Sequence, residues 1–139
     1  LIASDIVTAG RTSRNEIFDY DIYSSKTRIY VDDELKLYDS CRITPETMDP
    51  ARRGLLEGKL SSGIVYAYAP DIPEGICDRL NAAAHASDIE AAAGLVDSRI
   101  ITVRFIGTDM IAIKDFVYNI WDILRCELIG KGAVRVRKY

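Results

Sequence analysis

Apolar and polar residues alternate over much of the first 44 positions, a pattern that predicts β-strands. The first alternating run covers residues 2–8 and stops at Gly10, where a glycine permits a bend. Residues 16–23 are rich in aromatic and β-branched side chains, so they also favour a strand. The opening third of the chain therefore predicts a β-rich layer.

A hairpin is predicted next. Two alternating runs, residues 28–31 and 35–38, flank the acidic turn Asp32-Asp33-Glu34. The second run continues to Ile43 and ends before Pro45, because proline has no backbone donor for a sheet. The polar residues that follow predict a loop.

The rest of the chain interleaves strands with helices. Residues 62–69 predict a strand of mixed exposure, and residues 99–106 form the strongest strand pattern of the chain. A first helix is predicted at about 73–86, since proline suits the first helical position. The alanine-rich residues 87–94 are ambiguous.

The second predicted helix, at about 109–129, carries the most regular apolar stripe and ends before Gly130. The stripe is formed by Met110, Ile113, Val117, Ile120, Trp121, Leu124 and Leu128. Strands followed by helix, strand and helix exclude a doubly wound sheet. The predicted fold class is α+β, mostly β, with two helices.

Composition narrows the function classes. The chain has 139 residues, a net charge of −3 and a pI near 5.2, which gives no electrostatic reason to expect a nucleic acid or an anionic membrane as partner. No apolar stretch is long enough to cross a bilayer, and the first residues do not resemble a signal peptide. The cysteines Cys41, Cys77 and Cys126 are widely spaced and predict free, buried thiols in a reducing compartment, so we expect a cytoplasmic protein.

The sequence shows no recognisable catalytic or nucleotide-binding motif. His85 is the only histidine, so neither a two-histidine metal site nor an imidazole relay can form within the chain. Glycine-rich phosphate loops are absent. Arg11, Arg14 and Glu16 are the densest polar group, which could form an ion-pair network or line a partner interface.

The chain resembles the urease accessory proteins of the UreD (UreH) family along its whole length. Asp5 and Gly10-Arg11 match the family segment acidic-x-x-x-x-Gly-Arg, and Trp121 begins the Trp-x-x-Leu-Arg motif of a closing helix. Asn15 stands where the family often has glycine, and Tyr139 replaces a usual tryptophan. The similar segments are residues 5–11, 14–18, 28–39, 95–107, 120–125, 130–131 and 137–139.

This resemblance implies layered or β-helical-type sheets with two helices. Family members are longer than this chain, so residues 1–139 are expected to be a single domain or the C-terminal half of a larger UreD-like domain. The resemblance also implies a non-catalytic chaperone or scaffold that binds urease apoenzyme together with UreF and UreG and assists nickel insertion. UreG would be the GTPase, in agreement with the missing phosphate loop.

The resemblance further suggests residue roles. Asp5 and Asp39 match family carboxylates, and with Glu16 they are candidates for a weak, transient Ni²⁺ path, since oxygen ligands let the ion move on. No tightly bound cofactor is expected. The alternative for these carboxylates is ion pairing with Arg11, Arg14 or Arg42. The candidate structural or interface residues are Gly10, Arg11, Arg14, Trp121, Arg125 and Arg137.

Two rival functions stay open at this point. One is a carboxylate-dependent hydrolase in which Asp5, Asp39 and Glu16 converge in a cleft. The other is a β-rich interaction module unrelated to urease. The chain on its own is also expected to self-associate, if a missing half supplies strands to the same sheets.

Overall fold

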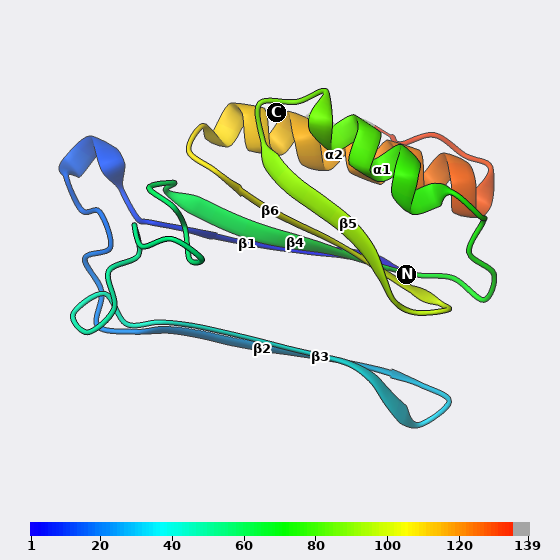
Figure 1. Ribbon diagram of the computed structural model, residues 1–139, viewed down its shortest axis with the longest axis horizontal. Helices are drawn as coiled ribbons and strands as arrows, with labels where there is room; N and C mark the ends of the chain where they lie inside the picture. Colours follow the sequence, from blue (N-terminus) through cyan, green and yellow to red (C-terminus); the bar gives the residue numbers. More distant parts are fainter. Residues whose placement is uncertain (135–139) are drawn as a thin grey trace.

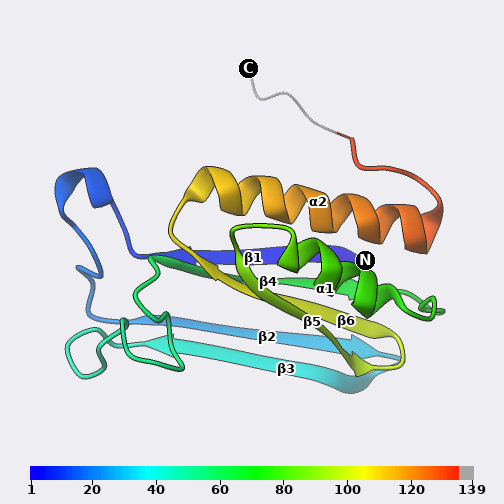
Figure 2. The ribbon, with the colours of Figure 1, turned by 45° about the horizontal axis from the view of Figure 1, so that its top comes forward.

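The computed structural model describes residues 1–134 and arranges them in three layers. Two helices lie on one face of a four-stranded sheet, and a long hairpin lies on the other face (Figures 1 and 2). The predicted α+β, mostly β class is therefore confirmed. Neither helix within residues 1–134 has the length and apolar character that crossing a membrane requires.

The central sheet is antiparallel throughout, in the order β1-β4-β6-β5. Its strands are β1 (Ile2–Thr8), β4 (Ser61–Tyr68), β6 (Ile100–Gly107) and β5 (Glu90–Asp97). The two inner strands are covered on both faces, which explains why β4 and β6 are nearly continuous apolar runs. The strand of mixed exposure that residues 62–69 predict is in fact a largely buried central strand.

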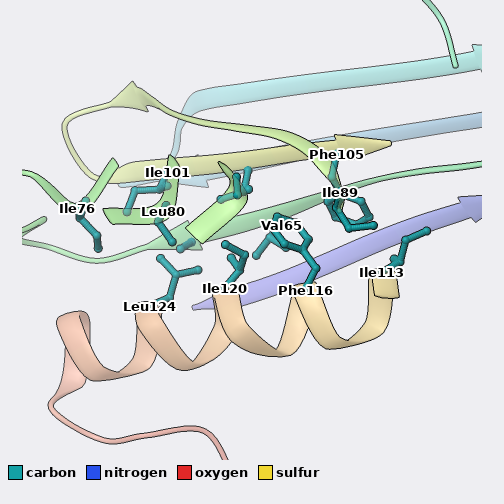
Figure 3. Close-up of a cluster of buried hydrophobic side chains, with 13 residues drawn as sticks. Val65, Ile76, Leu80, Ile89, Ile101, Phe105, Ile113, Phe116, Ile120 and Leu124 are labelled. Atoms are coloured by element: carbon teal, nitrogen blue, oxygen red, sulfur yellow. The ribbon is translucent and has the colours of Figure 1, made fainter. Parts of the chain in front are cut away.

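The helical layer holds the main core (Figure 3). α1 (Ile76–His85) and α2 (Met110–Ile129) bring Leu80, Ile120 and Leu124 against the sheet, and all three side chains are fully buried. Asp109 caps α2, its side chain accepting a hydrogen bond from the backbone of Ile111 at 2.8 Å. Gly130 ends α2 in the left-handed conformation, with φ of +65°.

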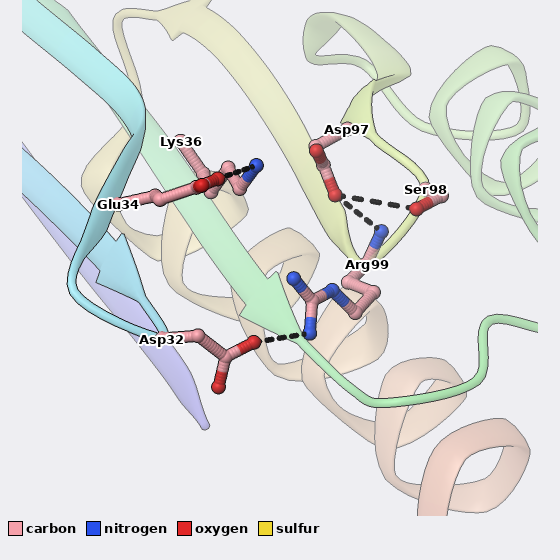
Figure 4. Close-up of polar contacts among 6 residues, drawn as sticks. All are labelled: Asp32, Glu34, Lys36, Asp97, Ser98 and Arg99. Carbon is pink, nitrogen blue, oxygen red and sulfur yellow. Dashed lines mark hydrogen bonds and ion pairs between the residues drawn. The ribbon is translucent and has the colours of Figure 1, made fainter.

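The third layer is the hairpin of β2 (Tyr23–Val31) and β3 (Glu34–Ile43). Asp32 and Asp33 form its turn with φ of +53° and +62°, a conformation that Asp tolerates better than most residues. A smaller core, which includes Leu37 and Ile100, joins the hairpin to the central sheet. Figure 4 shows Arg99 of the β5–β6 turn bound to Asp32 at 3.0 Å, a contact that closes the tip of the hairpin onto the sheet.

Several local predictions need correction. Residues 16–22 are not a strand but follow the short 3₁₀ helix η1 (Thr12–Arg14), because Phe18 has a φ of +54° and its N–H donates to the carbonyl of Ala9. The first helix begins at Ile76, three residues later than expected. The ambiguous alanine-rich stretch is mostly strand β5.

Cys126 also differs from the expectation. Its side chain is exposed on α2, whereas Cys41 and Cys77 are partly buried, and all three are free thiols. A residue near the end of an amphipathic helix is buried only on the face toward the sheet, and Cys126 lies outside that face.

Candidate functional site

A cavity of about 590 Å³ lies between the central sheet and the hairpin. Its polar lining comes from strands of both layers, with Asp5 on β1, Asp39 and Cys41 on β3, and Arg104 on β6. Because side chains alternate between the faces of a strand, Asp39 and Cys41 both point away from solvent toward the central sheet. The chain thus brings two of the predicted carboxylates, Asp5 and Asp39, to the same cavity.

Asp39 is held by two donors from the facing sheet. Tyr66 Oη donates to one carboxylate oxygen at 2.9 Å, and Arg104 Nη2 donates to the other at 2.6 Å. Burial alone would raise the pKa of Asp39, but the hydrogen bonds from Arg104 and Tyr66 and the charge of Arg104 together lower it. Asp39 is therefore ionised, and both of its carboxylate oxygens already accept a hydrogen bond. Any ligand of Asp39 must compete with Arg104.

Cys41 and Tyr23 of the cavity lining, and Tyr66, which donates to Asp39, are held neutral. Burial, aided by the nearby Asp39 charge, raises the pKa of Tyr66 to about 12. Burial and the same charge raise the pKa of the Cys41 thiol, so it is not a ready thiolate nucleophile or metal ligand. Burial also raises the pKa of Tyr23. Near neutral pH, these hydroxyls and this thiol can donate hydrogen bonds but do not act as bases.

Asp5 is the less committed carboxylate. It lies on β1, an edge strand of the sheet within the described residues, and it accepts a hydrogen bond from the hydroxyl of Ser25 at a long 3.4 Å. Glu90 of β5 lines the same cavity but pairs with Lys59 at 2.8 Å. Asp5 can therefore accept a new ligand at less cost than Asp39 or Glu90.

Glu16 does not line this cavity. It follows η1, and its carboxylate accepts a hydrogen bond from Arg11 Nε at 2.5 Å. The same loop holds Gly10, with φ of +113°, so close to Glu16 that a Cβ on Gly10 would collide with the Glu16 carbonyl oxygen. Of the predicted Arg11–Arg14–Glu16 network, the structure contains the Arg11–Glu16 pair; Arg14 is exposed and makes no ion pair within residues 1–134.

The predicted interface residues of α2 lie elsewhere. Trp121 lines an apolar groove of about 680 Å³ between α2 and β1, together with Tyr118 and Ile6. The Arg125 guanidinium stacks over the Trp121 ring at 5.3 Å, and its Nε donates to the carbonyl of Gly132. Arg137, the last of the predicted interface residues, and Tyr139 lie outside the described residues.

No preformed metal cluster is present in the described part of the chain. Within residues 1–134, no three His, Cys, Asp or Glu side chains gather closely enough to hold a metal ion. Sequence reasoning missed Tyr66, Cys41 and Arg104 as members of the site. In the sequence, Arg104 stands out only as a charge inside an apolar strand, the one signal that could have indicated a partly buried carboxylate partner.

The amino-acid sequence is similar to those of known urease accessory proteins. The profile of the UreD urease accessory protein family matches residues 1–138. The urease accessory protein UreD of Haloarcula marismortui is 31% identical over 140 aligned positions, covering 99% of this chain and 47% of that protein. UreD of Sporosarcina pasteurii is 29% identical over 122 positions, covering 85% of this chain and 46% of that protein. The chain spans about half the length of these curated relatives, and it belongs to the UreD urease accessory protein family.

Proposed function

We propose that this chain is a non-catalytic scaffold in urease assembly, which binds urease apoenzyme together with UreF and UreG and assists the insertion of nickel. The observation that carries the proposal is the family match over residues 1–138. The cavity is compatible with it, because burial and the charge of Asp39 raise the pKa of the lining Cys41 thiol, which is therefore not a ready thiolate nucleophile.

The cavity also suggests how nickel would be handled. Nickel is cargo here, so a site that releases it is more useful than one that retains it. Asp5 would be the first ligand, because its weak contact with Ser25 is easily replaced by the ion. Asp39 would join only when Arg104 moves aside, which keeps binding weak.

Complex formation is tested by co-purification. The chain is expected to retain urease apoenzyme and UreF on an affinity column, and UreG when UreF is present. A chain that retains neither urease apoenzyme nor UreF would contradict the scaffold function. Turnover of ester or phosphoester substrates that is lost in Asp39→Asn would instead support the hydrolase alternative.

Nickel handling is tested in a urease activation assay. Asp5→Asn and Asp39→Asn are expected to lower activation while leaving binding to UreF intact. Asp19→Asn is the matched control, because Asp19 is exposed and makes no ion pair within the described residues. Calorimetry is expected to give a dissociation constant of about 1 μM or weaker, that is, a binding free energy no stronger than about −8 kcal/mol. One tight site, or activation unchanged by both aspartate variants, would remove these residues from the path.

A further inference from the structure

The outer face of the hairpin has an unusual composition. Side chains that alternate with the inward-facing ones line this face, which looks away from the central sheet (Figures 1 and 2). No acidic residue belongs to it; apart from Ser24 and Ser40, it consists of three cations, two tyrosines and a leucine. We call this set the basic hairpin face: Lys26, Arg28, Tyr30, Leu35, Tyr38 and Arg42.

The register of the hairpin makes these residues contiguous. Arg28 pairs across the strands with Tyr38, and Tyr30 pairs with Leu35. The Arg28 guanidinium stacks over the Tyr38 ring at 5.2 Å, so the two side chains form one contiguous group on this face. Tyr30, Tyr38 and Leu35 are 58%, 52% and 50% exposed, which is high for large side chains with apolar bodies.

Ion pairing among the described residues does not explain this pattern. None of Lys26, Arg28 and Arg42 makes an ion pair with another described residue, whereas Arg11, Lys36, Lys59, Arg79, Arg99 and Arg104 all do. Cations two residues apart on one strand face repel each other, and here no carboxylate compensates for that. The positive charge is also local, because the chain as a whole carries −3.

We propose that the basic hairpin face docks an acidic surface of a protein, and that this protein is urease apoenzyme. This rests on the proposed function. Arginine and tyrosine are the side chains most enriched where protein interfaces bury their energetic centre, and lysine at the rim adds attraction at long range. The stacked Arg28 and Tyr38 supply the centre, while Lys26 and Arg42 flank it.

The acidic turn at the tip of the hairpin restricts how an acidic partner can be oriented on the basic hairpin face. Asp32, Asp33 and Glu34 follow directly after the basic stretch of β2, and Asp32 is held in place by Arg99. An acidic partner surface is attracted along the strands and repelled at the tip. The same turn, with the acidic balance of the chain, disfavours a nucleic acid strand running along the hairpin.

The experiment measures binding of the immobilised chain to urease apoenzyme. Lys26→Glu with Arg28→Glu is compared with Arg52→Glu and Arg53→Glu, which make the same charge change on another exposed segment. The hairpin variant is expected to bind at least about tenfold more weakly, mostly through slower association, and the control to bind like the wild type. Wild-type binding is expected to weaken as salt shortens the Debye length from about 30 Å at 0.01 M to about 8 Å at 0.15 M.

Two further variants keep the result interpretable. Lys26→Gln with Arg28→Gln removes the charges without reversing them, which covers the case in which the glutamates prevent folding. Tyr30→Ala removes an exposed side chain that packs into neither core, so a loss of binding with unchanged thermal unfolding supports docking.

The outcomes separate the docking site from the function. If the wild type does not bind urease apoenzyme, the proposed function itself loses its support. If the wild type binds and the hairpin and control variants bind equally well, the docking site is wrong while the function stands. A single-stranded oligonucleotide is the third probe; if the hairpin substitutions abolish its binding and leave urease binding unchanged, the face belongs to a nucleic acid and the proposal is overturned.

Discussion

Gly10 has a φ angle of +113°, and a Cβ at this position would collide with the carbonyl oxygen of Glu16. Gly10→Ala is therefore expected to lower the free energy of unfolding by about 2 kcal/mol or more. Gly58→Ala is the matched control, because Gly58 also has a positive φ, +80°, but open space around it. Denaturant titration measures both, and equal losses would show that the collision is relieved by movement of the loop.

Asp39 provides a pH-dependent prediction. Its pKa is lowered in the folded chain, so it contributes stability above the unfolded-state pKa, and that contribution is lost as pH falls through the folded-state pKa. Asp39→Asn is expected to destabilise the chain at pH 7 and to differ less from the wild type below about pH 4, near the ordinary pKa of aspartate. Unfolding measured across this pH range tests it, with Asp19→Asn as control. A constant difference between wild type and Asp39→Asn at all pH values would contradict the prediction.

The partners of Asp39 also mark how far sequence reasoning reaches at single residues. Similarity to a known family pointed to Asp39 itself, but Tyr66 is 27 positions and Arg104 is 65 positions away along the chain. Only the packing of the hairpin on the central sheet brings these three together. Arg11 and Glu16, five positions apart, could be expected to interact from local spacing alone.

Among the helices and strands, those with a regular pattern of apolar residues could be predicted from the sequence. Helix α2 was predictable because its apolar stripe recurs over five turns, and the hairpin because an acidic turn separates two alternating runs. Residues 16–22 misled because their aromatic content favours strands, whereas the positive φ of Phe18 belongs to a loop closed by its bond to Ala9. In β5, alanine gives neither a helical nor a strand signal, and its pairing with β6 makes it a strand.

Strand β1 is an edge of the central sheet within the described residues. Leu1 and Tyr68 exchange two backbone hydrogen bonds, and the N–H of Ala9 donates to Leu60. In an antiparallel pair these bonds alternate, so odd-numbered residues of β1 bond to β4 and the backbone groups of Ser4 point to the open edge. An unprotected edge of this kind pairs readily with another copy of the chain.

Ser4→Pro is expected to reduce self-association of the chain. Proline removes the outward N–H but leaves the hydrogen bonds to β4 in place. Edge strands tolerate proline at such a position. Ser4→Ala is the control, because it changes the side chain and retains the donor. Light scattering coupled to size exclusion measures the associated fraction at matched concentrations. Equal association of the proline and alanine variants would mean that β1 is not the contact.

On the scale of the whole molecule, the central sheet separates two cores of unequal size. The core on the helical face joins both helices and most of the sheet (Figure 3), whereas the core under the hairpin has five buried members. Ion pairs from Arg104 and Arg99 reinforce the smaller core at the cavity and at the tip (Figure 4). The hairpin is thus the layer with the least buried apolar surface to hold it, and such layers open before the rest of a domain unfolds.

Leu37→Ala and Leu80→Ala are expected to separate these two layers. Both side chains are buried, so each truncation is expected to destabilise the layer that contains it by about 2–5 kcal/mol. Leu80→Ala should lower the global free energy of unfolding, because its core holds the helices and sheet together. Leu37→Ala should instead speed amide hydrogen exchange in β2 and β3 while exchange in α2 and β6 stays close to that of the wild type. If Leu37→Ala speeds exchange equally in all four elements, the hairpin and the central sheet unfold as one unit, and the smaller core is not a separate cooperative layer.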